Sequence, residues 1–332
     1  MLFQPAIIAL LMASALGVAM LAAAAPFAVQ VIRRWDIRSG SELQLALERR
    51  TYLFSTLVTF VLAIQLVALL LFVFNADRMA VMFVGAMCAV GTLNANAYGF
   101  PALLAQMALF FLAAMWLAVN HVDTRGRDYP LVKIKYGLLV ALLPVLATVL
   151  GLQWQYFANL QADVITSCCG SLFSGEAKGL SGDLSALPAK PALIGFYAAL
   201  GIAIAAAGHT AWHRTFGYAT AAASAVAFAA AIAGTLSFLS LYIYEHPHHH
   251  CPFCILKPEY DWQGYWLYVP LFAATAAGLS VGAIQPFRRV ASLAAVIPAV
   301  TGRLAAVAAW GFLLFAAVAS VMILRSNLIL IE

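Results

Sequence analysis

Apolar residues occur in long runs along this chain, and short polar segments separate the runs. Each run is close to the roughly 20 residues that an α-helix needs to cross the hydrocarbon core of a bilayer. The pattern predicts an all-α fold, a polytopic membrane helical bundle with about eight transmembrane helices. We expect one integral membrane domain over residues 1–332. The predicted spans are residues 5–31, 51–74, 101–121, 136–157, 191–208, 217–243, 262–284 and 304–324.

Composition supports this interpretation, because 64% of the residues are hydrophobic and only 9% are charged. Ordinary soluble domains carry roughly 25% charged residues. The lipid bilayer is therefore the expected environment, and the net charge of +5 is no sign of a nucleic-acid partner. No phosphate-binding glycine pattern is present, so ATP-driven work would need a separate subunit.

The basic residues predict which side of the membrane each loop faces. With the N-terminus outside, 13 of the 18 Lys and Arg residues fall in inner segments and 5 in outer segments. Basic loops mark the cytoplasmic side, so both termini are expected outside, in a bacterial inner membrane. All five cysteines then lie on the oxidising outer face, where disulfides form. The three outer segments that hold them are residues 76–100, 157–190 and 244–261.

The first outer segment is apolar but short, and it ends in the turn-forming sequence TLNANAYGFP. It predicts a re-entrant or interfacial helix near residues 79–97, since irregular backbone at membrane depth must be buried in protein or line a cavity. The alternative is that this segment is a full span. The sidedness of everything after it would then be inverted.

The sharpest chemical motif is Cys251-Pro252-Phe253-Cys254. Two thiols separated by two residues can close a small disulfide or bind one metal ion. His250 and Lys257 flank the motif, and a cationic neighbour stabilises the reactive thiolate. A disulfide that only staples the loop is the alternative interpretation.

Cys168 and Cys169 form the second pair. Adjacent cysteines form only strained disulfides, because ordinary bridges need α-carbons about 4.4–6.8 Å apart. We therefore expect one or both to find a partner elsewhere. Cys251 and Cys254 are the obvious candidates, and together the four would form either a relay of two dithiols or a four-sulfur metal site.

A run of histidines directly precedes Cys251 and suggests a different chemistry. Disulfide exchange does not need four imidazoles, whereas copper or zinc would bind them together with the thiols. A solvated, pH-sensitive loop is the alternative for these residues. The candidate metal ligands are His246, His248, His249, His250, Cys251, Cys254, Cys168 and Cys169.

The CPFC-Ile-Leu motif at the outer boundary, the second cysteine pair and the helical bundle together resemble the disulfide-generating quinone reductases of bacterial inner membranes. These enzymes are broadly grouped with the vitamin K epoxide reductases. The resemblance implies electron transfer from periplasmic thiols to quinone, with Cys251 and Cys254 as the quinone-proximal pair and Cys168 and Cys169 as the partner-facing pair. This chain departs from the family in having eight spans, a reversed order of the pairs, and Pro258 where the family tends to carry a basic residue, a role that Lys257 could take.

Three functions remain open from the sequence. The first is thiol–disulfide electron transfer between a periplasmic partner and quinone, with Cys251, Cys254, Cys168, Cys169 and Lys257 as catalytic residues. The second is binding of copper or zinc, or assembly of a metal cofactor, by the same Cys and His residues. The third is a membrane-anchoring subunit of a larger respiratory or export complex, in which the cysteines form only structural disulfides. The role of Cys88 is left open.

Overall fold

The computed structural model describes residues 2–126, 128–161 and 180–330. The structure is 81% helical, and its described residues form no strand. Within this described part, eight helices are long and apolar enough to cross a membrane, which confirms the predicted all-α polytopic bundle. Contacts divide the chain into unit 1, which comprises Met1–Asn75, Asn96–Leu160 and Ala283–Val300, and unit 2, which comprises Ala76–Ala95, Gln161–Gly282 and Thr301–Glu332. The single domain over residues 1–332 stays a prediction.

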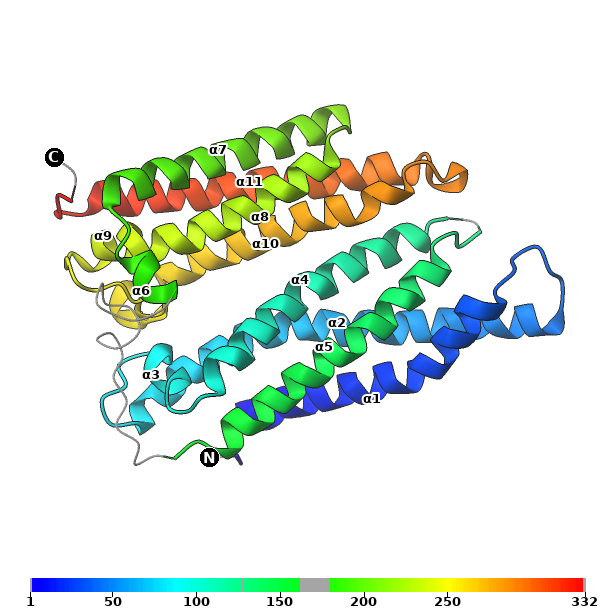
Figure 1. Cartoon of the computed structure of the whole chain (residues 1–332), viewed down its shortest axis with the longest axis horizontal. Helices are drawn as coiled ribbons and strands as arrows, with labels where there is room; N and C mark the ends of the chain where they lie inside the picture. Colours follow the sequence, from blue (N-terminus) through cyan, green and yellow to red (C-terminus); the bar gives the residue numbers. More distant parts are fainter. Residues whose placement is uncertain (1, 127, 162–179, 331–332) are drawn as a thin grey trace. The chain divides into compact units, whose positions relative to one another are not determined.

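Unit 1 is built on four long helices. They are α1 (Pro5–Arg34), α2 (Glu42–Met79), of which the part up to Asn75 belongs here, α4 (Gly99–Asp123) and α5 (Val132–Ala158). Helix α5 packs along α1 and α4 (Figure 1). The inner faces of the four helices bury a continuous apolar core that includes Phe27, Leu62, Trp116, Tyr136 and Leu146.

A chain of buried amide side chains links all four helices of unit 1. The Ser14 hydroxyl on α1 donates to Gln153 Oε1 on α5 at 2.8 Å, and Gln153 Nε2 donates to Gln106 Oε1 on α4 at 2.8 Å. Gln65 on α2 completes the chain, because its Nε2 donates to the Ala13 carbonyl at 3.1 Å. Inside a bilayer an unsatisfied polar group is expensive, so these bonds fix how the helices are paired.

A buried ion pair joins the ends of α4 and α5. Lys135 Nζ lies 2.7 Å from Asp123 Oδ2, and the two side chains are 1% and 0% exposed. Lys135 also donates to the Ser55 hydroxyl at 3.3 Å, and Asp123 Oδ1 accepts the Leu131 amide N–H at 2.8 Å. The predicted span at residues 136–157 leaves Lys135 in the loop before it. The structure instead places it in the first turn of α5, pointing into unit 1.

Unit 2 contains the remaining long helices. They are α7 (Ala189–His213), α8 (Gly217–Gly234), α10 (Gln263–Ile284) up to Gly282, and α11 (Val296–Arg325) from Thr301 onward. Helix α8 continues through the π-helical turn η2 (Thr235–Leu239) into α9 (Ser240–Tyr244), and the short α6 (Leu180–Ser185) precedes α7. Helix α8 packs along α7 and closely against α10. A Cβ on Gly282 of α10 would lie 2.5 Å from the Ala221 Cβ on α8, so a small residue is required there.

The segment between α2 and α4 contains only short helices. It forms the 3₁₀ turn η1 (Ala80–Met82) and the five-residue helix α3 (Ala89–Leu93), neither of which is long enough to span a bilayer. Helix α2 begins at Glu42, where the Ser41 hydroxyl accepts the Gln44 amide N–H, and so extends beyond the predicted span at residues 51–74.

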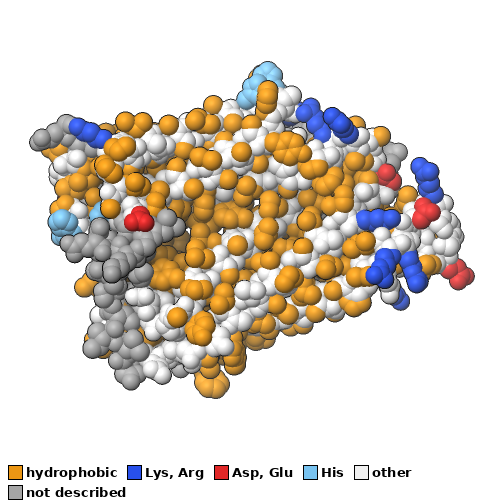
Figure 2. Space-filling model, viewed as in Figure 1, with side chains coloured by type: hydrophobic (Ala, Val, Ile, Leu, Met, Phe, Trp, Pro, Cys, Tyr) orange, Lys and Arg blue, Asp and Glu red, His pale blue; other side chains and the backbone are white. Residues whose placement is uncertain are grey.

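The outer surfaces of the helices are apolar, as the bilayer requires. Phe60 on α2 and Ile202 on α7 are 64% and 62% exposed. In Figure 2 hydrophobic side chains cover the sides of the helices, whereas Lys and Arg side chains gather near helix ends. Such a surface is unfavourable in water and favourable in lipid, which supports a membrane-embedded protein.

Candidate functional site

Three cysteine side chains meet inside unit 2. The Cys251 Sγ atom lies 3.2 Å from Cys254 Sγ and 3.4 Å from Cys88 Sγ. All three sulfur atoms lie within 4.8 Å of one another. Cys88 and Cys251 are 0% exposed and Cys254 is 5% exposed. Cys251 is therefore in contact with both of the other thiols, in a site that excludes bulk water.

Cys88 reaches the site because it precedes the short helix α3, every residue of which is buried. It adopts an extended conformation at the N-cap position. Asp77, near the end of α2, fixes this start of α3, since its Oδ1 accepts the Ala89 amide N–H at 3.2 Å. A carboxylate that satisfies an amide at a helix start holds the local backbone in place.

Two tyrosines hold the loop that carries Cys251 and Cys254. The Tyr244 hydroxyl on α9 donates to the Cys251 carbonyl at 2.6 Å, and the Tyr268 hydroxyl on α10 donates to the Pro252 carbonyl at 2.6 Å. Pro252 has no amide N–H, so its carbonyl is the main-chain polar group that needs a partner. The motif is thus anchored from two helices through its backbone carbonyls.

Cys254 begins the 3₁₀ turn η3 (Cys254–Leu256), which packs directly on the first turn of α10. A Cβ on Gly264 would lie 2.7 Å from the Leu256 Cδ2 atom and 3.0 Å from the Ile255 backbone carbon. Glycine is therefore needed for this close approach. A second 3₁₀ turn, η4 (Pro258–Tyr260), follows and leads into α10.

The four histidines of the predicted metal site lie in different environments. His246 and His248 are exposed, and His249 is partly buried with its ring centroid 4.2 Å from that of Tyr244. His250 is buried, and its Nδ1 donates to the Leu236 carbonyl in the π-helical turn at 2.7 Å. Within the described residues, no histidine joins the three sulfur atoms in a common set of metal ligands.

Lys257 is partly buried and lies between η3 and η4. It is within electrostatic reach of Asp77, which also interacts with Cys88. Asp77 therefore lies near Cys88, and Lys257 lies near Asp77. Such neighbours can stabilise a thiolate and receive its proton.

Cys168 and Cys169, expected to be partners of Cys251 and Cys254, lie outside the described residues. The thiol that the structure does bring to Cys251 is that of Cys88, which sequence reasoning did not assign to the site. The available signal was its predicted position on the same membrane face as the CPFC motif. A shared membrane face did not show that Cys88 contacts Cys251.

Comparison of the chain with protein-family models, curated proteins and solved structures gives no match. The arrangement itself permits two kinds of chemistry. One thiol in contact with two others can exchange disulfides, because exchange proceeds by attack of a thiolate on a neighbouring disulfide sulfur. Three buried sulfur atoms can also bind a soft metal ion.

Proposed function

We propose that the protein is a membrane thiol–disulfide oxidoreductase in which Cys251 is the sulfur shared between two alternative disulfides. The observation that carries this proposal is the contact of Cys251 Sγ with both Cys254 Sγ at 3.2 Å and Cys88 Sγ at 3.4 Å. A relay needs one sulfur that can change partner without a large movement of the chain. Cys251 satisfies that condition.

The reaction is written in two steps that balance. In the first, the Cys251 and Cys254 thiols form a disulfide and give two electrons and two protons to an acceptor, a quinone in our proposal, which becomes a quinol. In the second, the Cys88 thiolate attacks Cys251 Sγ, a Cys88–Cys251 disulfide forms, and Cys254 leaves as a thiolate that takes up the proton lost by Cys88. The second step exchanges one disulfide for another and needs no oxidant. Lys257 stabilises the thiolate, which is on Cys88 before the attack and on Cys254 after it.

The oxidising equivalent then leaves the membrane by exchange with a dithiol partner protein. Cys168 or Cys169 is the proposed exchange point, as the resemblance to quinone-linked disulfide generators implies. On this account the protein lies in a bacterial inner membrane with both termini and all five cysteines on the periplasmic side. The charge distribution of the loops and the usual redox state of that compartment support this placement.

Differential alkylation tests the proposal. The purified protein is reduced, excess reductant is removed, a short-chain quinone is added, and the thiols are labelled and identified by mass spectrometry. Wild-type protein should lose the label on Cys251 and, depending on which of the two disulfides is present, the label on Cys254 or on Cys88, while Cys251→Ser should keep the label on Cys254. A matched control, Cys88→Ser, should still form the Cys251–Cys254 disulfide. If Cys251 remains fully alkylated after quinone addition, the oxidoreductase proposal is wrong.

A soft-metal site is the second candidate, because the three sulfur atoms lie within 4.8 Å of one another. Three thiolates in a buried site suit Cu(I), which accepts soft ligands and low coordination numbers. Zinc usually takes four protein ligands in a structural site. The three sulfurs described here therefore favour copper over zinc.

Metal analysis separates the two candidates. Reduced wild-type protein is incubated with Cu(I) under anaerobic conditions, desalted and analysed for bound metal. A stoichiometric copper content that falls to background in both Cys88→Ser and Cys251→Ser would support the copper site. Copper retained by Cys251→Ser, or absent from the wild type, would contradict it.

A further inference from the structure

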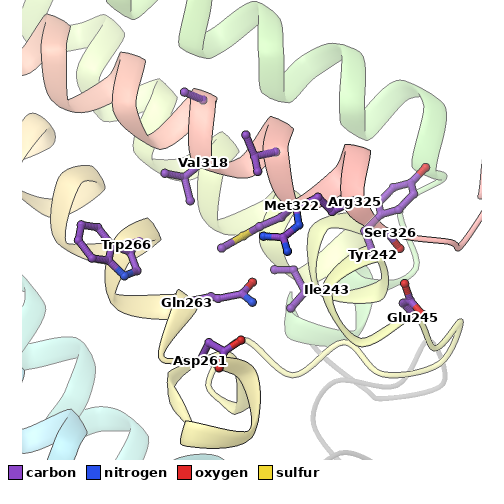
Figure 3. A pocket seen from close by; sticks show the side chains of 12 residues that line it. Tyr242, Ile243, Glu245, Asp261, Gln263, Trp266, Val318, Met322, Arg325 and Ser326 are labelled. Atoms are coloured by element: carbon purple, nitrogen blue, oxygen red, sulfur yellow. The ribbon is translucent and has the colours of Figure 1, made fainter.

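A groove of about 570 Å³ lies at the end of unit 2 that carries the cysteine loop (Figure 3). Its walls come from α9, the start of α10 and the last turns of α11. None of the three cysteines lines it. The groove is therefore a separate feature from the thiol site, and its own side chains indicate what it could bind.

One side of the groove is apolar and exposed. Trp266 on α10 and Val321 on α11 line it and are 65% and 51% exposed. Trp side chains are enriched at the boundary between hydrocarbon and head groups. The apolar wall thus suits an acyl chain, and the ends of α10 and α11 place the groove at the height of the head groups.

The other side of the groove carries opposite charges that do not neutralise each other. Arg325 lines one wall, and Figure 3 shows its side chain extending into the groove toward Gln263. Asp261 and Glu245 line the loop side. Among the described residues, Arg325 forms no ion pair with either carboxylate. Separate positive and negative positions in one groove complement a ligand that carries both charges.

The two carboxylates are held in place by their local structure. Glu245 and Asp261 both adopt left-handed backbone conformations, with φ of 51° and 52°, directly after α9 and η4. Residues other than glycine adopt this conformation at a cost. Glu245 Oε1 also accepts hydrogen bonds from the Asn327 amide N–H at 2.8 Å and from Asn327 Nδ2 at 3.0 Å. The acidic side of the groove is therefore preorganised.

We propose that this groove binds a phospholipid whose head group joins a phosphate to a primary ammonium, as in phosphatidylethanolamine. The phosphate pairs with the Arg325 guanidinium, which presents several N–H donors to phosphate oxygens. The ammonium donates to Asp261 and Glu245, and an acyl chain covers Trp266 and Val321. This inference does not depend on the redox proposal.

The same contacts explain why other common lipids are less suitable. An anionic phosphatidylglycerol has a neutral glycerol in place of the ammonium, which leaves both carboxylates without a cation. A phosphatidylcholine has a cation but no N–H donor, so the hydrogen bonds to Asp261 and Glu245 are lost. The groove should therefore select the primary ammonium.

Native mass spectrometry of the full-length protein tests the inference. The protein is extracted from vesicles that contain equal amounts of phosphatidylethanolamine, phosphatidylglycerol and phosphatidylcholine with identical acyl chains. Wild-type protein should retain phosphatidylethanolamine in preference to both others. Asp261→Asn should reduce this preference by about fivefold, the effect expected for one exposed ion pair. Arg325→Gln should reduce retention of all three lipids.

Matched controls remove a charge outside the groove. The controls are Glu259→Gln and Arg289→Gln. Glu259 lies in the same loop as Asp261, Arg289 is exposed elsewhere, and neither residue lines the groove. Both variants should retain the wild-type preference. Equal retention of the three lipids by the wild type, or an unchanged preference in Asp261→Asn, would overturn the proposed site.

Discussion

The sulfur atoms of Cys88 and Cys251 lie 3.4 Å apart, although the two residues are separated by 163 positions in the chain. This contact brings to the CxxC pair a third thiol that the sequence did not assign to the site. A CxxC pair alone can only open and close one disulfide. With Cys88 beside it, Cys251 has two sulfur neighbours, and the proposed relay uses the second of them to move an oxidising equivalent away from the pair.

Gly264→Ala should disturb the site through packing alone. The added methyl group would press against Leu256 and Ile255, which follow Cys254 directly. Overpacking of this kind costs about 1–3 kcal/mol and shifts the backbone. We expect lower thermal stability and slower formation of the Cys251–Cys254 disulfide, measured by timed alkylation. Gly201→Ala on α7 is the control, because nothing lies within 4 Å of its added Cβ.

Tyr268→Phe should weaken the anchoring of the loop without changing any thiol. It removes the hydroxyl that donates to the Pro252 carbonyl at 2.6 Å. Loss of one partner from a buried hydrogen bond costs about 1–3 kcal/mol. The loosened loop should also shift the midpoint potential of the Cys251–Cys254 couple, measured in a glutathione titration. Tyr218→Phe, at a position that is 62% exposed on α8, should leave both measurements unchanged.

The double variant His246→Ala, His248→Ala distinguishes a sulfur site from a mixed histidine and cysteine site. Both side chains are exposed and neither belongs to the group of three sulfur atoms. Any Cu(I) bound by the protein should therefore be retained in full after both substitutions, as measured by elemental analysis. A loss of half or more of the metal would show that the histidine run supplies ligands.

Substitution of Lys135 alone should lower the stability of the protein far more than substitution of both members of the Lys135–Asp123 ion pair. Lys135→Met leaves the Asp123 carboxylate buried without its cation, and breaking a buried pair in this way costs about 3–5 kcal/mol. Adding Asp123→Asn should recover most of that loss, since the amide oxygen can still accept the Leu131 amide N–H. Unfolding of the purified protein in mixed micelles measures both changes.

Lys133→Met is the control for this pair. Lys133 lies two residues away in the same helix and is exposed. Its substitution should change the free energy of unfolding by less than about 0.5 kcal/mol. Equal effects of Lys133→Met and Lys135→Met would contradict the buried ion pair.

The spanning helices could be predicted from the sequence because lipid imposes a simple condition on them. A run of about 20 apolar residues satisfies that condition whatever it packs against. The predicted span at residues 217–243 thus corresponds closely to the continuous helical segment Gly217–Tyr244. The position of Lys135 could not be predicted in this way, because its burial depends on a tertiary contact. A lysine near a helix end is typical of a solvated flank, and only its tertiary contact with Asp123 shows that it is buried.

The candidate site could be predicted only in part. The CPFC motif is local, so the contact between Cys251 and Cys254 follows from their spacing. The position of Cys88 depends on α3 folding back into unit 2 and on Asp77 fixing its start. The dispersal of the histidines depends on the π-helical turn that accepts a hydrogen bond from His250. Neither relationship has a periodic signature in the sequence.

The most direct test of the central claim is disulfide mapping in the Cys254→Ser variant. This variant removes the local partner of Cys251 and leaves Cys88 as its sulfur neighbour among the residues described here. After oxidation under denaturant-free conditions and blocking of the remaining thiols, peptide mass spectrometry should find a Cys88–Cys251 disulfide. A Cys251 that stays fully alkylated, or that pairs only between molecules, would contradict the shared role of Cys251.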